Sequence, residues 1–77
     1  MLEVDSIVEA TITKIWQHGL ELGYEGQRIS VRVTDIAEDW QASKQKLSVM
    51  RLGQSVLVRI TYYAEHHDAY LGTLTGI

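Results

Sequence analysis

The sequence predicts an all-β fold, a five-stranded closed antiparallel barrel with a short helix or irregular insertion between strands 3 and 4. Three observations predict it. Apolar and polar residues alternate in several short runs, turn residues separate these runs, and only the segment from Asp35 to Val49 lacks the alternation. With 77 residues, we expect one small domain, residues 1–77, with one hydrophobic core.

The first predicted strand runs from Ser6 to Trp16. Its apolar residues at positions 8, 10 and 12 alternate with polar ones, which is the period of a half-buried strand. The alternation slips at Lys14-Ile15-Trp16, where two apolar residues adjoin, and such a slip predicts a bulge or a strong bend. Gly19 follows, and its lack of a side chain suits a close backbone approach or a sharp change of direction.

The second and third predicted strands form a hairpin. Leu20 and Leu22 resume the alternation, and the segment 23–26, with a glycine at each end, predicts the turn. Ile29 to Val33 then alternates as the third strand. This period points Arg32 outward, away from the predicted core.

The insertion after the third strand predicts a short helix. Asp39 is a residue type that caps helices, and we expect the helix over Trp40 to Lys44, with Trp40 and Leu47 turned to the core.

Two further strands complete the barrel. The fourth, Val56 to Tyr63, has apolar residues on both faces, which suggests burial on both. A polar turn at Glu65 to Asp68 precedes the last strand, Tyr70 to Thr75.

Composition excludes several classes of protein. Without cysteine, the chain has no disulfides, no thiolate chemistry and no cysteine-based zinc site. No segment approaches the roughly 18 apolar residues that span a bilayer, and the first residues lack the pattern of a signal peptide. We therefore expect a soluble, cytoplasmic protein with no membrane partner.

The sequence offers no recognisable catalytic or metal site. It contains no glycine-rich phosphate loop before a lysine, no His-Glu-x-x-His and no serine–histidine pair with the neighbours of a nucleophile. His66-His67-Asp68 contains metal-ligand types, but adjacent side chains on an extended strand point to opposite faces, which favours a plain turn. We expect no enzyme, no cofactor and no metal.

Charge argues mildly against a nucleic-acid partner. The net charge is −3, whereas lysine and arginine supply most affinity for a phosphate backbone. Acidic residues outnumber basic ones up to Asp39, and the reverse holds after it. A locally basic surface is still open if bases from both halves converge.

Nearly the whole chain resembles the ribosomal protein S1 RNA-binding domain, a five-stranded oligonucleotide-binding (OB-fold) barrel. Ser6 to Ile15 is similar to the family's opening strand, and His18-Gly19-Leu20 matches its aromatic-glycine step. Val31 to Ile36 is similar to its third strand, and Val49 to Ile60 resembles its apolar pair, glycine and alternating strand. The order and spacing of these pieces carry the resemblance.

The resemblance implies single-stranded RNA binding and a role in translation. The family's contact positions are occupied here by His18, Glu21, Arg32 and Ala69. His18 and Arg32 keep suitable chemistry, whereas Glu21 repels phosphate and Ala69 offers no contact. We therefore expect weak, low-specificity RNA binding by the outer face of strands 2 and 3.

Five residues are the candidates for RNA contact. We expect stacking from Trp16 and His18 and phosphate contacts from the cationic side chains; each also has an ordinary structural explanation, as an edge-covering aromatic or a solvated charge. The alternative function is a barrel repurposed for protein contact, which the acidic balance favours. The expected partner is single-stranded RNA, with a protein partner possible, and we expect a monomer. The candidates are Lys14, Trp16, His18, Arg32 and Arg59.

Overall fold

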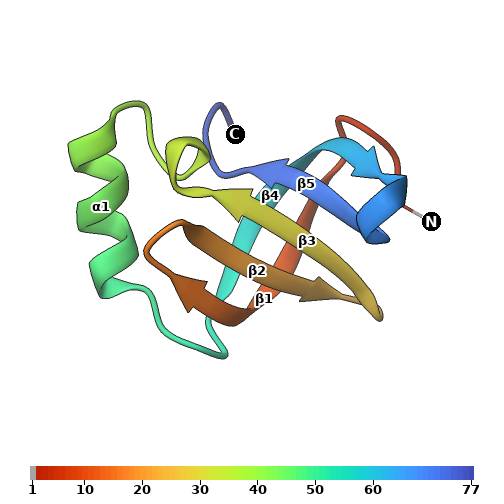
Figure 1. Ribbon diagram of the computed structural model, residues 1–77, viewed down its shortest axis with the longest axis horizontal. Coiled ribbons are helices and arrows are strands. Elements are labelled where there is room, and N and C mark those ends of the chain that lie inside the picture. Colours follow the sequence, from red (N-terminus) through yellow and green to blue (C-terminus); the bar gives the residue numbers. More distant parts are fainter. Residues whose placement is uncertain (1) are drawn as a thin grey trace.

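Five strands close into a barrel in the computed structural model, which describes residues 2–77 (Figure 1). Around the barrel the order is β1-β2-β3-β5-β4, and one helix, α1, lies at one end of it. The all-β barrel predicted from the alternation is therefore confirmed. The elements are β1 Ile7–Trp16, β2 Gly19–Tyr24, β3 Gln27–Arg32, α1 Trp40–Val49, β4 Ser55–Ala64 and β5 Ala69–Thr73.

The barrel is mixed rather than purely antiparallel. β3 and β5 pair in parallel, with Ile29 opposite Tyr70 and Ser30 opposite Leu71, whereas the other four pairings are antiparallel. The prediction of a wholly antiparallel barrel was wrong for a geometric reason. Strand direction cannot alternate around a closed ring with an odd number of strands, so one pair must be parallel.

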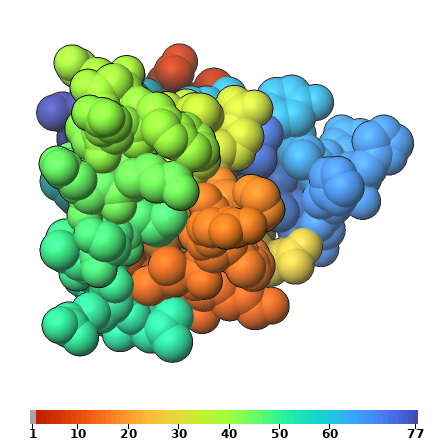
Figure 2. Space-filling model, turned by 60° about the vertical axis from the view of Figure 1, so that its left-hand side comes forward, coloured from red at the N-terminus to blue at the C-terminus, as the bar shows by residue number. Residues whose placement is uncertain are grey.

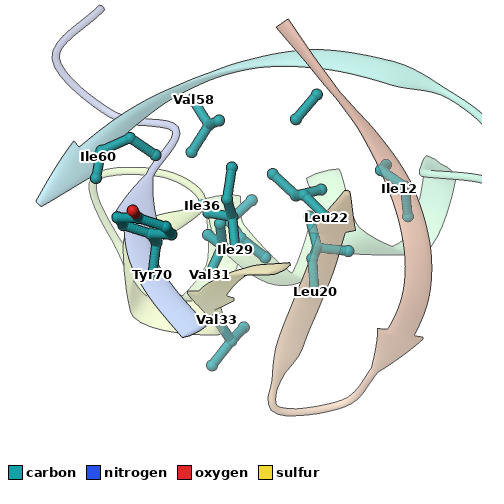
Figure 3. Close-up of a cluster of buried hydrophobic side chains, with 11 residues drawn as sticks. Ile12, Leu20, Leu22, Ile29, Val31, Val33, Ile36, Val58, Ile60 and Tyr70 are labelled. Atoms are coloured by element: carbon teal, nitrogen blue, oxygen red, sulfur yellow. The ribbon is translucent and has the colours of Figure 1, made fainter. Parts of the chain in front are cut away.

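The core consists of inward residues of all five strands together with Val33 and Ile36, which follow β3 (Figure 3). Each strand alternates, so every second side chain enters the barrel while its neighbours point outward. The predicted apolar periodicity identified most of these positions. Side chains with less than 2% exposure include Ile12, Leu20, Leu22, Ile29, Val31, Val58 and Ile60.

β1 is long because it serves two neighbours. Its first half, Ile7 to Thr11, pairs with β4, and its second half, from Thr11 to Trp16, pairs with β2. The register shifts between Ile12 and Lys14, which confirms the irregularity predicted from the slipped alternation.

Gly19 opens β2 where the backbone of β3 comes close. Its backbone φ of +148° is one that residues other than glycine rarely adopt, and a Cβ at this position would overlap the carbonyl oxygen of Val31. The predicted close backbone approach is confirmed.

Asp39 caps α1 as predicted. Its carboxylate accepts a hydrogen bond of 2.7 Å from the backbone N–H of Ala42, although the helix runs to Val49 rather than ending at Lys44. Ser43 is the fully buried residue of the helix, and Leu47 packs against the core as predicted. Among residues 2–77 no helix is long and apolar enough to cross a membrane.

The predicted burial of Trp40 was wrong. Its side chain is 54% exposed, and the Lys44 ammonium lies 5.1 Å from the centre of its ring. The buried side of α1 is made by Ser43 and Leu47. Trp40 lies in the first turn, where its bulk remains at the surface.

The predicted burial of both faces of β4 was also wrong. Val58 and Ile60 are fully buried, but Leu57 is 52% and Tyr62 59% exposed. Because α1 lies at the end of the barrel rather than against its side, no helix in the described part of the chain covers the outer face of β4 (Figure 1).

The chain around β3 and β5 differs slightly from the expectation. Val33 leaves β3 and begins a 3-10 turn, Val33–Asp35, yet its side chain stays buried. The predicted polar turn at Glu65 to Asp68 is a second 3-10 turn, Glu65–His67, followed by Asp68 in the left-handed conformation. β5 ends at Thr73.

Candidate nucleic-acid interface

The outer face of β3 carries three polar side chains in a line. Ile29 and Val31 point into the core, so Arg28, Ser30 and Arg32 point outward at alternate positions. Both arginines are exposed. This strand therefore places two cations on one face, separated by a hydroxyl.

β2 contributes few side chains to the same outer face, and we call its outward residues 19, 21 and 23 the floor of that face. Leu20 and Leu22 are buried, and of the alternate positions two are glycines, Gly19 and Gly23, with Glu21 between them. The middle of the face is consequently shallow, and Glu21 is the only large polar group on it from this strand.

Trp16 and Arg32 lie on the same outer face, on either side of Gly19. Trp16 pairs with Gly19, and Gly19 pairs with Arg32, so the two backbones lie about 10 Å apart, two strand spacings. Trp16 is 45% exposed, and the ammonium of Lys14 lies 5.7 Å from the centre of its ring. An exposed indole and three cationic side chains, with Arg28, therefore share one surface.

Arg32 also has an acidic neighbour. Its Nε lies 3.2 Å from Oδ2 of Asp35, and the arginine side chain is 70% exposed. Such an exposed ion pair contributes little to stability. It orients the guanidinium while the two terminal nitrogens, which make no other ion pair among residues 2–77, stay at the surface.

His18 lies in the short loop between β1 and β2. Its side chain is exposed, and its backbone carbonyl accepts a 2.8 Å hydrogen bond from the N–H of Val33. This bond ties the loop to the end of β3, beside Arg32. The exposed His18 therefore lies in a loop that adjoins Arg32 at the end of this face.

Glu21 is held in place by β1. The hydroxyl of Thr13 contacts both the Glu21 backbone oxygen, at 3.1 Å, and carboxylate Oε2, at 3.2 Å. Lys14 is the residue paired with Glu21 across the two strands. The carboxylate is therefore fixed on the floor of the face next to a cation.

A hollow of about 190 Å³ lies between this floor and the turn that joins β4 to β5. Arg28 forms its rim, since Nη2 donates a 2.6 Å hydrogen bond to the carbonyl of His67 in that turn. Figure 2 shows the β1–β2 hairpin in orange, with α1 in green on one side and the β4–β5 turn in blue projecting on the other. The hollow is lined by Glu21, Arg28, Ser30, Ala64, His67, Ala69 and Leu71.

Arg59 lies elsewhere on the barrel. It is on β4, paired with Ile7 of β1 and Thr73 of β5, so it is separated from the face of β2 and β3. Its guanidinium donates a 2.6 Å hydrogen bond to the carbonyl of Gly76. The structure therefore brings Lys14, Trp16, His18 and Arg32 together, but not Arg59.

Sequence reasoning missed Arg28 and the wall opposite it. The same alternation that pointed Arg32 outward also points Arg28 outward, so the signal was present in the third strand. His67 and Ala64 reach the face only because the β4–β5 turn folds beside β3, which no local pattern indicates.

The β4–β5 turn has its own polar contact. Tyr63 donates a 2.9 Å hydrogen bond to the carboxylate of Asp68, and this bond is the main reason that the pKa of Tyr63 is raised above 10.0. No cluster of three or more potential metal ligands occurs among residues 2–77.

No family model matches the sequence, and no curated protein matches it. Solved structures do match the fold. GSP13 from Bacillus subtilis has a TM-score of 0.80 at 15% identity, over 96% of this chain and 56% of that one. MJ1198 from Methanocaldococcus jannaschii has a TM-score of 0.79 at 14% identity, over 100% of this chain and 97% of that one.

A third match is a chain of the a/eIF2alpha–aDim2p–rRNA complex from Pyrococcus horikoshii OT3. It has a TM-score of 0.80 at 19% identity, over 96% of this chain and 45% of that one. This chain thus spans about half the length of GSP13 and of the Pyrococcus chain. These likenesses show that the chain shares its fold with known proteins, and they confirm the small five-stranded barrel that the sequence predicted.

Proposed function

We propose that this barrel binds single-stranded RNA weakly and with low sequence selectivity, through the outer face of β2 and β3 and the end of β1. The arrangement of Trp16 and Arg32 on either side of Gly19 carries the proposal. An aromatic platform and cations on a shallow floor are what single-stranded nucleic acid requires, since bases stack and phosphates need positive charge. OB-fold barrels bind ligands on this same face.

The contacts divide by chemistry. We assign base stacking to Trp16 and His18, because both are exposed beside the floor. Phosphate contacts fall to Lys14, Arg28 and Arg32. The sequence had suggested Arg59 as a phosphate contact. We assign this contact to Arg28 instead, because Arg28 lies on the same face as Lys14 and Arg32.

The comparisons support RNA as the ligand class. One of the similar structures, from Pyrococcus horikoshii, is a complex that contains rRNA. At 19% identity the likeness shows a shared fold alone. The proposed function therefore rests on the side chains that this chain carries at the end of β1 and on β2 and β3.

We expect the affinity to be modest because the charges are few. The chain carries a net charge of −3, and Glu21 lies among the three cations of the face. Loss of one aromatic platform removes about 1–3 kcal/mol of stacking per base, and neither Glu21 nor Ala69 replaces it. Binding driven by phosphate contacts weakens steeply with salt.

Tryptophan fluorescence tests the proposal at low salt. In a Trp40→Phe variant, Trp16 is the remaining tryptophan, and titration with short oligouridine or oligoadenosine RNA should quench its emission. Arg32→Ala should weaken that response, because it removes a cation two strands from the indole. An amide chemical-shift map of the same titration should move residues 14–32. No response with RNA and protein near a millimolar would refute the proposal.

A second candidate function is protein contact by the opposite side of the barrel. Val4, Ile7 and Leu57 are exposed there at 55%, 46% and 52%, and Ile7 and Leu57 lie on the paired strands β1 and β4. Sedimentation or size-exclusion measurements test this: a stable oligomer or a co-purifying protein, with indifference to RNA, would favour it. A monomer without a partner would remove its support.

A further inference from the structure

The hollow beside Glu21 has two walls of different chemistry. Glu21, Arg28 and Ser30 supply polar groups from β2 and β3, whereas Ala64 and Leu71 supply apolar surface from β4 and β5. A nucleobase has the same division, an apolar face and a polar edge. The volume of about 190 Å³ limits the occupant to a group of roughly this size rather than a stretch of chain.

Two small residues keep the hollow open. Ala64 and Ala69 are paired with each other across β4 and β5, at the start of the turn, and both line the hollow. The bond from Arg28 to the carbonyl of His67 holds the turn beside β3. The strand pairing and the bond from Arg28 therefore form the hollow together.

Glu21 is one of the residues that line this hollow, and its carboxylate carries only acceptor oxygens. The Thr13 hydroxyl uses one lone pair of Oε2, and no other hydrogen bond to the carboxylate exists among residues 2–77. A carboxylate can accept two donors side by side. Guanine is the base whose Watson–Crick edge offers two neighbouring donors, N1–H and N2–H₂, whereas cytosine and adenine offer one exocyclic amino group.

We infer that this hollow is a subsite for one unstacked guanine of the bound RNA, read by the carboxylate of Glu21. The inference rests on the proposed function, because Trp16, Lys14 and Arg32 bring the strand to the face. Arg28, at the rim, offsets the repulsion between Glu21 and the RNA backbone. Selectivity stays low along the rest of the strand, where stacking and phosphate contacts do not distinguish bases, and is confined to this position.

Fluorescence anisotropy with five labelled octamers tests the inference. They are oligouridine and four versions with a single central guanine, inosine, adenine or cytosine. We expect the guanine octamer to bind about fivefold or more tighter than the uridine, adenine and cytosine ones, with inosine, which lacks the amino group, in between. Equal affinity for all five octamers would overturn the inference while leaving RNA binding intact. No binding of any octamer would refute the proposed function as well.

Two variants distinguish guanine recognition by Glu21 from the general repulsion between its negative charge and RNA. Glu21→Gln should abolish the guanine preference and tighten binding of oligouridine. A variant that tightens all five octamers equally, with the preference intact, would overturn the inference. Ala64→Leu narrows the hollow without changing any charge, so the variant should bind all five octamers with the same affinity. Retention of the preference by a folded Ala64→Leu variant would also overturn the inference.

Discussion

Ser43 of α1 forms two hydrogen bonds with the backbone of Ala37. Its Oγ accepts from the Ala37 N–H at 3.0 Å and donates to the Ala37 carbonyl at 3.3 Å. Ser43 is fully buried. The side chain thus joins the helix to the segment that follows the 3-10 turn at Val33–Asp35, and it fixes α1 at the end of the barrel.

Ser43→Ala should therefore lower the free energy of unfolding by about 1–3 kcal/mol, because it leaves partly buried backbone groups without partners. Urea unfolding followed by tryptophan fluorescence measures the loss. Ser48→Ala is the matched control, since Ser48 lies in the same helix with an exposed hydroxyl, and its effect should stay within about 0.5 kcal/mol. Equal effects of the two substitutions would contradict the role of Ser43.

Gly19→Ala tests the close approach of β2 and β3. The new Cβ would overlap the carbonyl of Val31, so the strands must separate or the chain must fail to fold. Gly26→Ala is the control: its φ of +81° is also unfavourable for alanine, but nothing lies within 4 Å of the added atom. It should cost about 1–2 kcal/mol, well below the effect at Gly19. Thermal unfolding by circular dichroism measures both, and similar losses would disprove the steric argument.

The fold was predictable because the strands alternate, and alternation reports directly on which face is buried. The errors arose where burial depends on distant elements. Trp40 was expected inside, yet α1, at the barrel end, buries Ser43 and Leu47 and leaves Trp40 at the surface. Leu57 and Tyr62 are exposed because no helix among residues 2–77 covers the outer face of β4. Local hydrophobicity cannot indicate which outer faces a neighbour will cover.

The candidate site was predictable only in part for a related reason. Trp16 and Arg32 come from the pattern of single strands, and the barrel brings them together. The hollow beside Glu21 needs the parallel pairing of β3 with β5, which carries the β4–β5 turn to Arg28. Considered alone, Glu21 weakened the case for RNA binding. Because it lines a hollow, we propose instead that its carboxylate reads a base.

Tyr63 should ionise above its ordinary pKa of 10.0, because the hydroxyl donates to the negative Asp68 carboxylate. The folded-state pKa is raised, so the stabilisation is present below about pH 10 and is lost as the pH rises through the folded-state value. Asp68→Asn removes the negative charge and should lower the pKa of Tyr63. Titration of the Tyr63 ring carbons by NMR measures this, and an unchanged midpoint in the variant would contradict it.

Arg28 and Arg59 provide the sharpest comparison of positions on the barrel. Both are arginines on strands. Arg28 lies on the same face as Trp16, whereas Arg59 lies on β4 and donates a hydrogen bond to the carbonyl of Gly76. If Arg28 contacts a phosphate, Arg28→Gln should weaken oligouridine binding and reduce the slope of log affinity against log salt by about one unit.

Arg59→Gln removes the same charge from the other side of the barrel and should leave the slope unchanged. Arg28→Lys keeps the charge and should retain most of the slope, which separates the charge from the bond to the His67 carbonyl. Anisotropy titrations at several salt concentrations measure all three variants. Equal slopes for Arg28→Gln and Arg59→Gln would mean that RNA affinity depends on net charge alone. That result would contradict the assignment of the interface to the face of β2 and β3.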